Sequence, residues 1–186
     1  MIMAVDLTLL RNRRKNVKNN ALRTKRITFL ALFASLALLL SYVEMLLPPI
    51  FTAVPGVKMG LPNIVIILIL YRFGIKEAAI VSFVRLVIVT LLFGSIMMFW
   101  YSLAGAVLSL AVMGILKKLD FLSTVGVSVA GAIMHNVGQT IVAILLLQTS
   151  EIGYYMIVLS ITGTIAGIFI GLCGALLHKR FAKMKM

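Results

Sequence analysis

The chain has 186 residues, of which 62% are hydrophobic and only 12% are charged. A soluble globular domain has about 45–50% apolar and about 25% charged residues, so the composition excludes an ordinary soluble fold and indicates an integral membrane protein. The formal net charge is +13. A single cysteine, Cys173, excludes a disulfide framework and a multi-cysteine metal site.

The chain begins with a basic tail. Eight of the 18 basic residues lie between Arg11 and Arg26. A basic tract can bind nucleic acid, but this one directly precedes an apolar segment, so orientation in the membrane and contact with anionic headgroups explain it better. The apolar segment that follows is too long for a signal peptide, and we interpret it as a retained helix.

Six apolar segments follow the tail. A helix needs about 20 apolar residues to cross a hydrocarbon core of about 30 Å. The second segment is short, and the prolines before it predict a non-helical connection. The chain therefore divides into a tail at 1–26, an all-α transmembrane domain of six helices at 27–178 and a basic tail at 179–186. The predicted helices are 27–47, 59–72, 75–94, 98–116, 122–148 and 152–178.

The basic residues predict the orientation of these helices. Lys and Arg concentrate on the cytoplasmic side of membrane proteins. With six helices, the two basic tails and the basic turns at 72–76 and 117–121 fall on one side. The opposite connections, near 48–58, 94–97 and 148–152, carry Lys58 as their one basic residue. Both termini are therefore expected in the cytoplasm.

Small residues spaced by four predict close helix packing. Gly163, Gly167 and Gly171 form such a ridge in the last helix. The first helix has Ala31 with Ser35 and Ala37 with Ser41, and the fourth has Gly105 with Ser109. Internal packing is the favoured interpretation. Docking of another membrane subunit is the alternative, for which the first helix is the best candidate.

Polar side chains at membrane depth mark the candidate binding site, because a central charge costs about 2.5–3.5 kcal/mol on insertion scales. In the predicted topology these residues lie from the bilayer centre outward, so we expect an outward-facing cavity with the 48–63 connection as its lid. Cations opposite Glu44 suit a small ligand with a carboxylate or phosphate and an apolar or aromatic body. The candidates are Arg85, His135, Asn136, Gln139, Lys58, Asn63, Glu44, Trp100 and Tyr101.

Several of these candidate residues also have an interpretation in which they only stabilise the fold. Arg85 could pair with Glu44 or with helix-end carbonyls, Asn136 and Gln139 could bond across helices, and the aromatic pair could belong to an interfacial belt. The chain has five acidic residues and no local carboxylate motif, no P-loop and histidines on different helices. These features argue against a metal site and a nucleophilic triad, so we expect binding rather than catalysis.

Three strings are similar to a known family: VKMGLPN at 57–63, YRFGIKEA at 71–78 and HNVGQ at 135–139. Over most of 27–178 the chain resembles the hydrophobic family labelled heptaprenyl diphosphate synthase component I, also called Gx transporter proteins. That family resembles the substrate-binding S components of energy-coupling factor (ECF) transporters. The resemblance implies a six-helix S-component-like bundle with an outward cavity.

The resemblance also implies partners. In S components, small residues of the first helix contact a transmembrane coupling subunit that two cytosolic ATPases drive, so the chain itself needs no cofactor. Ala31, Ala34 and Ser35 correspond to this face, although a clean AxxxA motif is absent. The implied role is uptake of a vitamin-like molecule or an isoprenoid or quinone precursor across a bacterial cytoplasmic membrane.

The family label offers an alternative, a membrane accessory subunit of heptaprenyl diphosphate synthase in menaquinone or isoprenoid biosynthesis. Soluble synthases of the common all-α type hold magnesium diphosphate with DDxxD motifs. This sequence contains no DD pair, so we do not expect catalysis by this polypeptide. A stand-alone facilitator or scaffold is a third hypothesis.

Overall fold

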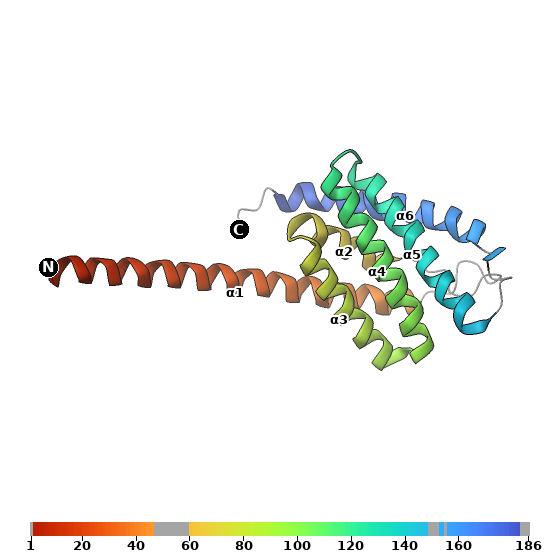
Figure 1. Ribbon diagram of the computed structural model, residues 1–186, viewed down its shortest axis with the longest axis horizontal. Helices are drawn as coiled ribbons and strands as arrows, with labels where there is room; N and C mark the ends of the chain where they lie inside the picture. The colour runs from red at the N-terminus through yellow and green to blue at the C-terminus, as the bar shows by residue number, and fades with distance from the viewer. Residues whose placement is uncertain (1, 47–59, 149–152, 155, 183–186) are drawn as a thin grey trace.

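The computed structural model describes residues 2–46, 60–148, 153–154 and 156–182, and these residues form six α-helices with no strand among them (Figure 1). The all-α prediction is confirmed, and from the second helix onward the boundaries agree with the predicted ones to within four residues. The helices are α1 (Ile2–Leu46), α2 (Leu61–Arg72), α3 (Ile75–Phe93), α4 (Ile96–Leu119), α5 (Thr124–Leu147) and α6 (Met156–Ala182).

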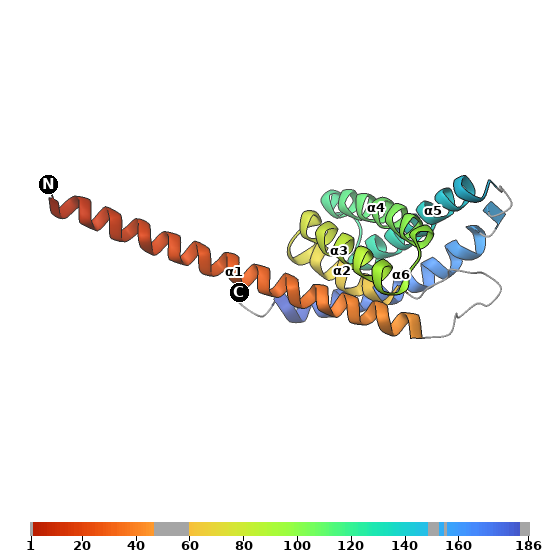
Figure 2. The ribbon, with the colours of Figure 1, turned by 90° about the horizontal axis from the view of Figure 1, so that it is seen from below.

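Helix α1 is much longer than its predicted span of 27–47. It begins at Ile2 and runs without a break across residue 26, where the basic tail was expected to end. Neither Gly nor Pro occurs between Ile2 and Leu46, so nothing in the sequence interrupts the helix. The N-terminal part projects away from the other helices (Figures 1 and 2), and residues 12–28 are exposed.

The other helices close into a ring. Contacts join α1 to α2, α2 to α6, α6 to α5, α5 to α4, α4 to α3 and α3 back to α1, and α2 also touches α3. Helix α2 is the most buried element, since every residue from Val65 to Leu70 is at most 3% exposed. A helix that is apolar on all sides belongs inside a bundle. With 12 residues, α2 covers about 18 Å, which is less than the hydrocarbon thickness.

The outer surface of the bundle is apolar. Helices α1, α4, α5 and α6 are long and apolar enough to cross a membrane. Helix α3 is not among them, and it contains three charged residues, Lys76, Glu77 and Arg85. Large side chains such as Leu91 and Leu145 are 79% and 70% exposed. Soluble monomers rarely expose continuous apolar surface, and contact with lipid accounts for it here. The chain is therefore a multi-pass membrane protein.

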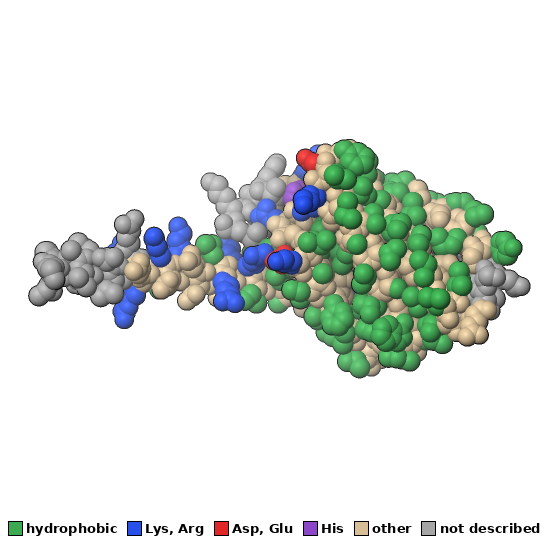
Figure 3. All heavy atoms as spheres, viewed as in Figure 1, with side chains coloured by type: hydrophobic (Ala, Val, Ile, Leu, Met, Phe, Trp, Pro, Cys, Tyr) green, Lys and Arg blue, Asp and Glu red, His purple; other side chains and the backbone are tan. Residues whose placement is uncertain are grey.

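The two ends of the bundle differ in charge. The turns at 73–74 and 120–123 and the C-terminal end of α6 lie at the end from which α1 projects, which we call the inner end (Figure 1). The turn at 94–95 lies at the opposite, outer end. On the face shown in Figure 3, Lys and Arg side chains are spaced along the coloured part of the projecting helix and gather at the inner end. This distribution favours an inner end that faces the cytoplasm.

The glycine ridge of α6 packs against α5. A Cβ at Gly167 would lie 2.7 Å from Val129 Cα, and one at Gly171 would lie 2.7 Å from Val125 Cα. Real Cβ atoms do not approach a backbone so closely, so these glycines let the two helices touch through their main chains. The predicted internal packing of this ridge is confirmed.

Gly167→Ala is expected to lower the free energy of unfolding by about 1–3 kcal/mol, because the added methyl group forces α5 and α6 apart. Thermal unfolding of the purified protein in detergent measures the effect. Gly153→Ala is the matched control, since no atom lies within 4 Å of a Cβ built there. Equal midpoints for the two variants would show that the close contact does not matter to stability.

Candidate functional site

Two helices meet at Arg85, which lies midway along α3. Its Nη1 donates to Ser41 Oγ of α1 at 3.4 Å, and Glu44, three residues further along α1, interacts with it electrostatically. The Arg85 Nε is buried and has no hydrogen-bond partner among the described residues. A guanidinium group offers five N–H donors, so this side chain keeps donor capacity for an anionic ligand.

Glu44 also joins α1 to the start of α2. Its Oε1 accepts a hydrogen bond from the backbone N–H of Gly60, the residue that caps α2. A carboxylate at a helix N-terminus is stabilised by the helix dipole. Gly60 has a φ of 73°, and a Cβ there would lie 3.2 Å from both Asn63 Nδ2 and Ile170 Cδ1. Positive φ and close packing together explain the glycine.

His135 lies in the interface between α5 and α4. A Cβ at Gly105 would lie 2.8 Å from the His135 carbonyl oxygen and 2.9 Å from its ring atoms Cε1 and Nδ1. The imidazole ring therefore rests on the backbone of α4 at a position where only glycine fits. Gln139, one turn further along α5, is half-buried.

Asn136 faces α6. Its Nδ2 donates to the Leu159 carbonyl oxygen at 2.6 Å, and its backbone carbonyl oxygen accepts from Thr140 Oγ1 at 2.9 Å. This bond to Leu159 matches the structural alternative for Asn136, a hydrogen bond across helices, and the expected contact of Asn136 with a ligand stays a prediction. The Asn136 amide thus connects α5 to α6, next to the glycine ridge.

The aromatic candidates lie near the start of α4. Trp100 is 51% exposed and its ring stacks edge-on against Phe99 at a centroid distance of 5.6 Å, while Tyr101 is half-buried. The exposure of Trp100 matches an interfacial belt. Lys58 lies outside the described residues.

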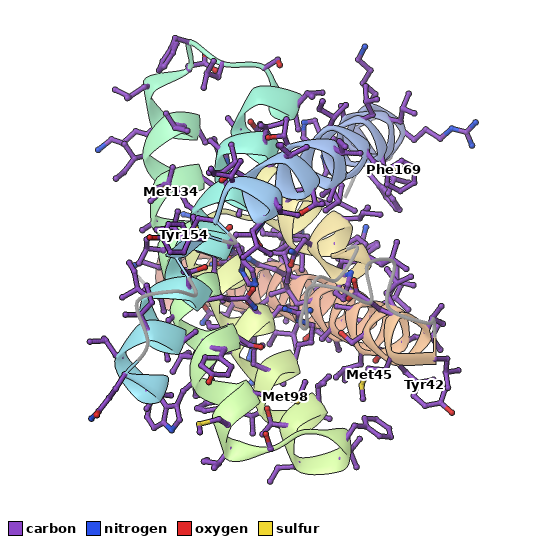
Figure 4. All side chains as sticks on the ribbon, turned by 90° about the vertical axis from the view of Figure 1, so that its right-hand side faces the viewer. Tyr42, Met45, Met98, Met134, Tyr154 and Phe169 are labelled. Atoms are coloured by element: carbon purple, nitrogen blue, oxygen red, sulfur yellow. The ribbon has the colours of Figure 1, made fainter. Side chains whose placement is uncertain are left out.

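The predicted site residues fall into two groups. Glu44, Asn63 and Arg85 are brought together by α1, α2 and α3. His135 and Asn136 lie on α5, whose main contacts are with α4 and α6. Figure 4 views the bundle from its outer end, with α1 and α5 on opposite sides, and Tyr42 and Phe169 point away from the bundle. A ligand that touches both groups must therefore reach across the outer half of the ring.

A second polar cluster lies at the inner end, and the sequence did not predict it. Lys117 Nζ donates to the Leu70 carbonyl oxygen at 2.5 Å and lies 5.2 Å from the centroid of the Tyr71 ring. The His178 ring lies 5.8 Å from the same ring. A cation at the C-terminal carbonyls of α2 complements the helix dipole, so Lys117 caps the buried helix.

Lys117→Met is expected to lower the free energy of unfolding by about 1–2 kcal/mol, because α2 loses a charged hydrogen-bond donor and Tyr71 loses a cation–π contact. Lys118→Met removes the same charge from an exposed neighbour and serves as the control. Thermal unfolding in detergent should separate the two variants. The capping role of Lys117 is wrong if their midpoints coincide.

Other residues of the site escaped prediction. Ser41 was noted as a small packing residue, yet it is 5% exposed and accepts from Arg85. Its signal was the spacing from Glu44, since residues three apart share a helix face. Nothing in the sequence predicted that the Gly60 amide would donate a hydrogen bond to Glu44. Within the described ranges, no three side chains of metal-binding type come together.

A family model described as heptaprenyl diphosphate synthase component I matches residues 33–177. The matched range contains α2 to α5 completely, together with residues 33–46 of α1 and most of α6. It thus includes both groups of candidate site residues, while the projecting part of α1 lies outside it. No curated protein and no solved structure matches the chain.

Proposed function

The chain belongs to the heptaprenyl diphosphate synthase component I family, and from that premise we propose that it is the substrate-binding S component of an ECF-type uptake transporter. Its substrate is a small vitamin-like molecule or an isoprenoid or quinone precursor that carries an anionic group. The observation that carries this proposal is Arg85, a cation midway along α3 whose buried Nε has no partner among the described residues. Intramembrane charges of this kind mark substrate pathways.

The roles of the individual residues follow from their chemistry. Arg85 binds the carboxylate or phosphate, and Glu44 holds Arg85 in place from α1. His135 and Gln139 supply hydrogen bonds to the rest of the ligand, with Asn63 at the start of α2. Lys58 adds a second cation. Trp100 and Tyr101 accommodate an apolar or aromatic body. No step requires bond cleavage by this chain.

The exposed side of α1 is the proposed contact with the coupling subunit. Ala31 and Ser35 are exposed and Ala34 is half-buried, so a partner helix can approach this surface closely. Two cytosolic ATPases bound to that subunit supply the energy, and the complex lies in a bacterial cytoplasmic membrane. Pull-down of this chain with a co-expressed coupling subunit and ATPases tests the assembly. Failure of the three to associate would remove the transporter role.

Native mass spectrometry of the full chain in nanodiscs tests the substrate class. The probes are farnesyl diphosphate, farnesol and benzoate, which separate the anionic group from the apolar body. Binding of farnesyl diphosphate or benzoate, with weaker binding of farnesol, supports recognition through Arg85. Farnesol binding as tightly as its diphosphate would show that the anion is not recognised.

The family description itself favours a second candidate, a membrane accessory subunit of heptaprenyl diphosphate synthase. Since the sequence has no DD pair, a soluble synthase would provide the catalytic residues. A stable complex with such a synthase, with product formation lost when this chain is omitted, would establish this candidate in place of the transporter.

A further inference from the structure

The basic residues of the projecting part of α1 lie mainly on one side of the helix. From Arg13 to Arg26 the helix carries seven Lys and Arg residues and no acidic residue. With 3.6 residues per turn, five of the seven fall within an arc of about 120°, while Arg13 and Arg23 fall outside it. We call these five the basic stripe: Arg14, Lys15, Lys18, Lys25 and Arg26.

The basic stripe continues the side of α1 that packs on the bundle. Phe29 and Phe33 fall within the same arc, and Phe33 is 5% exposed and contacts Phe73 and Phe181. Arg26, the last residue of the stripe, forms an ion pair with Glu77 at the start of α3. The stripe therefore lies on the same side of α1 as the inner end of the bundle. That end carries further exposed cations at Lys76, Lys118, Lys179 and Arg180.

Membrane headgroups account for only part of this charge. At 1.5 Å per residue, Arg14 lies about 20 Å and Lys18 about 13 Å beyond Ile27, where the apolar span begins. The headgroup layer adds about 6 Å and the Debye length at physiological salt is about 8 Å, so Lys18 lies at the limit of the headgroup charge and Arg14 lies beyond it. The side of the helix opposite the stripe carries Asn16, Asn20 and Thr24, not the apolar face that a surface-lying helix needs.

Apolar side chains lie among these cations. Leu22 falls within the stripe and is 52% exposed, and Leu119 and Phe121 beside Lys118 are 62% and 68% exposed. Protein interfaces combine apolar and charged contacts, whereas a phosphate backbone offers only charge. We propose that the basic stripe and the inner end of the bundle together form a docking surface for the acidic face of a cytosolic protein, extended over about 20 Å.

A helical peptide about as long as the stripe, with Glu every three to four residues along one face and Leu between, serves as the probe. Its affinity is measured by fluorescence anisotropy with the full chain in nanodiscs of zwitterionic lipid. The double variant Lys15→Gln/Lys18→Gln is expected to weaken binding about fivefold to tenfold, as two surface charge pairs would. Arg13→Gln/Arg23→Gln removes the same charge outside the stripe and should change the affinity by less than about twofold.

Three results would overturn the proposal. Equal losses for the two double variants would mean that the peptide senses only net charge. Tighter binding of a DNA duplex, with the same dependence on the stripe, would make nucleic acid the occupant. Loss of peptide binding in nanodiscs of anionic lipid would make the membrane surface the occupant. The proposal stands apart from the ligand site, because Arg85→Met should leave the affinity for the peptide unchanged.

Discussion

Arg85→Met is expected to weaken binding of farnesyl diphosphate by about 30-fold or more, because loss of one partner from a buried charge pair costs about 2–5 kcal/mol. Arg85→Lys should recover part of this affinity, since an ammonium group keeps the charge but not the fork of N–H donors. Titration by native mass spectrometry in nanodiscs gives the three affinities.

Arg72→Met is the matched control for this experiment, because Arg72 ends α2 at the inner end of the bundle. It removes the same charge far from the proposed site and should bind the probe as the unmodified chain does. The binding role of Arg85 is refuted by a folded Arg85→Met protein that keeps its affinity. Size-exclusion chromatography and circular dichroism establish that the variant is folded.

Glu44→Ala is expected to be the most destabilising single change, at about 3–5 kcal/mol. It leaves the Arg85 guanidinium without its charged neighbour and removes the acceptor of the Gly60 N–H. Glu44→Gln should cost less, since the amide oxygen still accepts from Gly60. Thermal unfolding in detergent without added ligand measures both.

A double-mutant cycle separates the two roles of Glu44. If Arg85 is the charge that Glu44 compensates, Glu44→Ala/Arg85→Met should be more stable than Glu44→Ala alone, yet still fail to bind farnesyl diphosphate. Strictly additive losses would mean that the two side chains are not coupled. If the double variant regains stability but does not bind the probe, Glu44 serves to neutralise the charge of Arg85, and Arg85 contacts the ligand.

The number and boundaries of the helices could be predicted because apolar runs and basic turns carry the information locally. Residues 98–116 were predicted and Ile96–Leu119 is helical, a difference of a few residues at each end. The extension of α1 through the tail was not predicted. Its Asn residues have modest helix propensity, and the helix continues because no Gly or Pro stops it.

The site was predictable in composition but not in arrangement. Arg85 and Glu44 stand out as charges within apolar segments, and their pairing was one of two open interpretations. The bond from the Gly60 amide to Glu44 depends on how α1 and α2 meet, which no local pattern specifies. The contact of His135 with Gly105 likewise joins two helices, although a glycine and a histidine at membrane depth are each unusual enough to draw attention.

The unbroken course of α1 has a mechanical consequence. A straight rod that passes through a membrane transmits any change of its tilt to both ends. Transmembrane helices tilt by about 20° on average, and a swing of that size about Ile27 moves Arg14 sideways by about 7 Å. Because no Gly or Pro lies between Ile2 and Leu46, this helix has no built-in hinge to absorb the motion. Reorientation of the bundle in the membrane would thus appear beyond its inner end as a lateral displacement of the projecting helix.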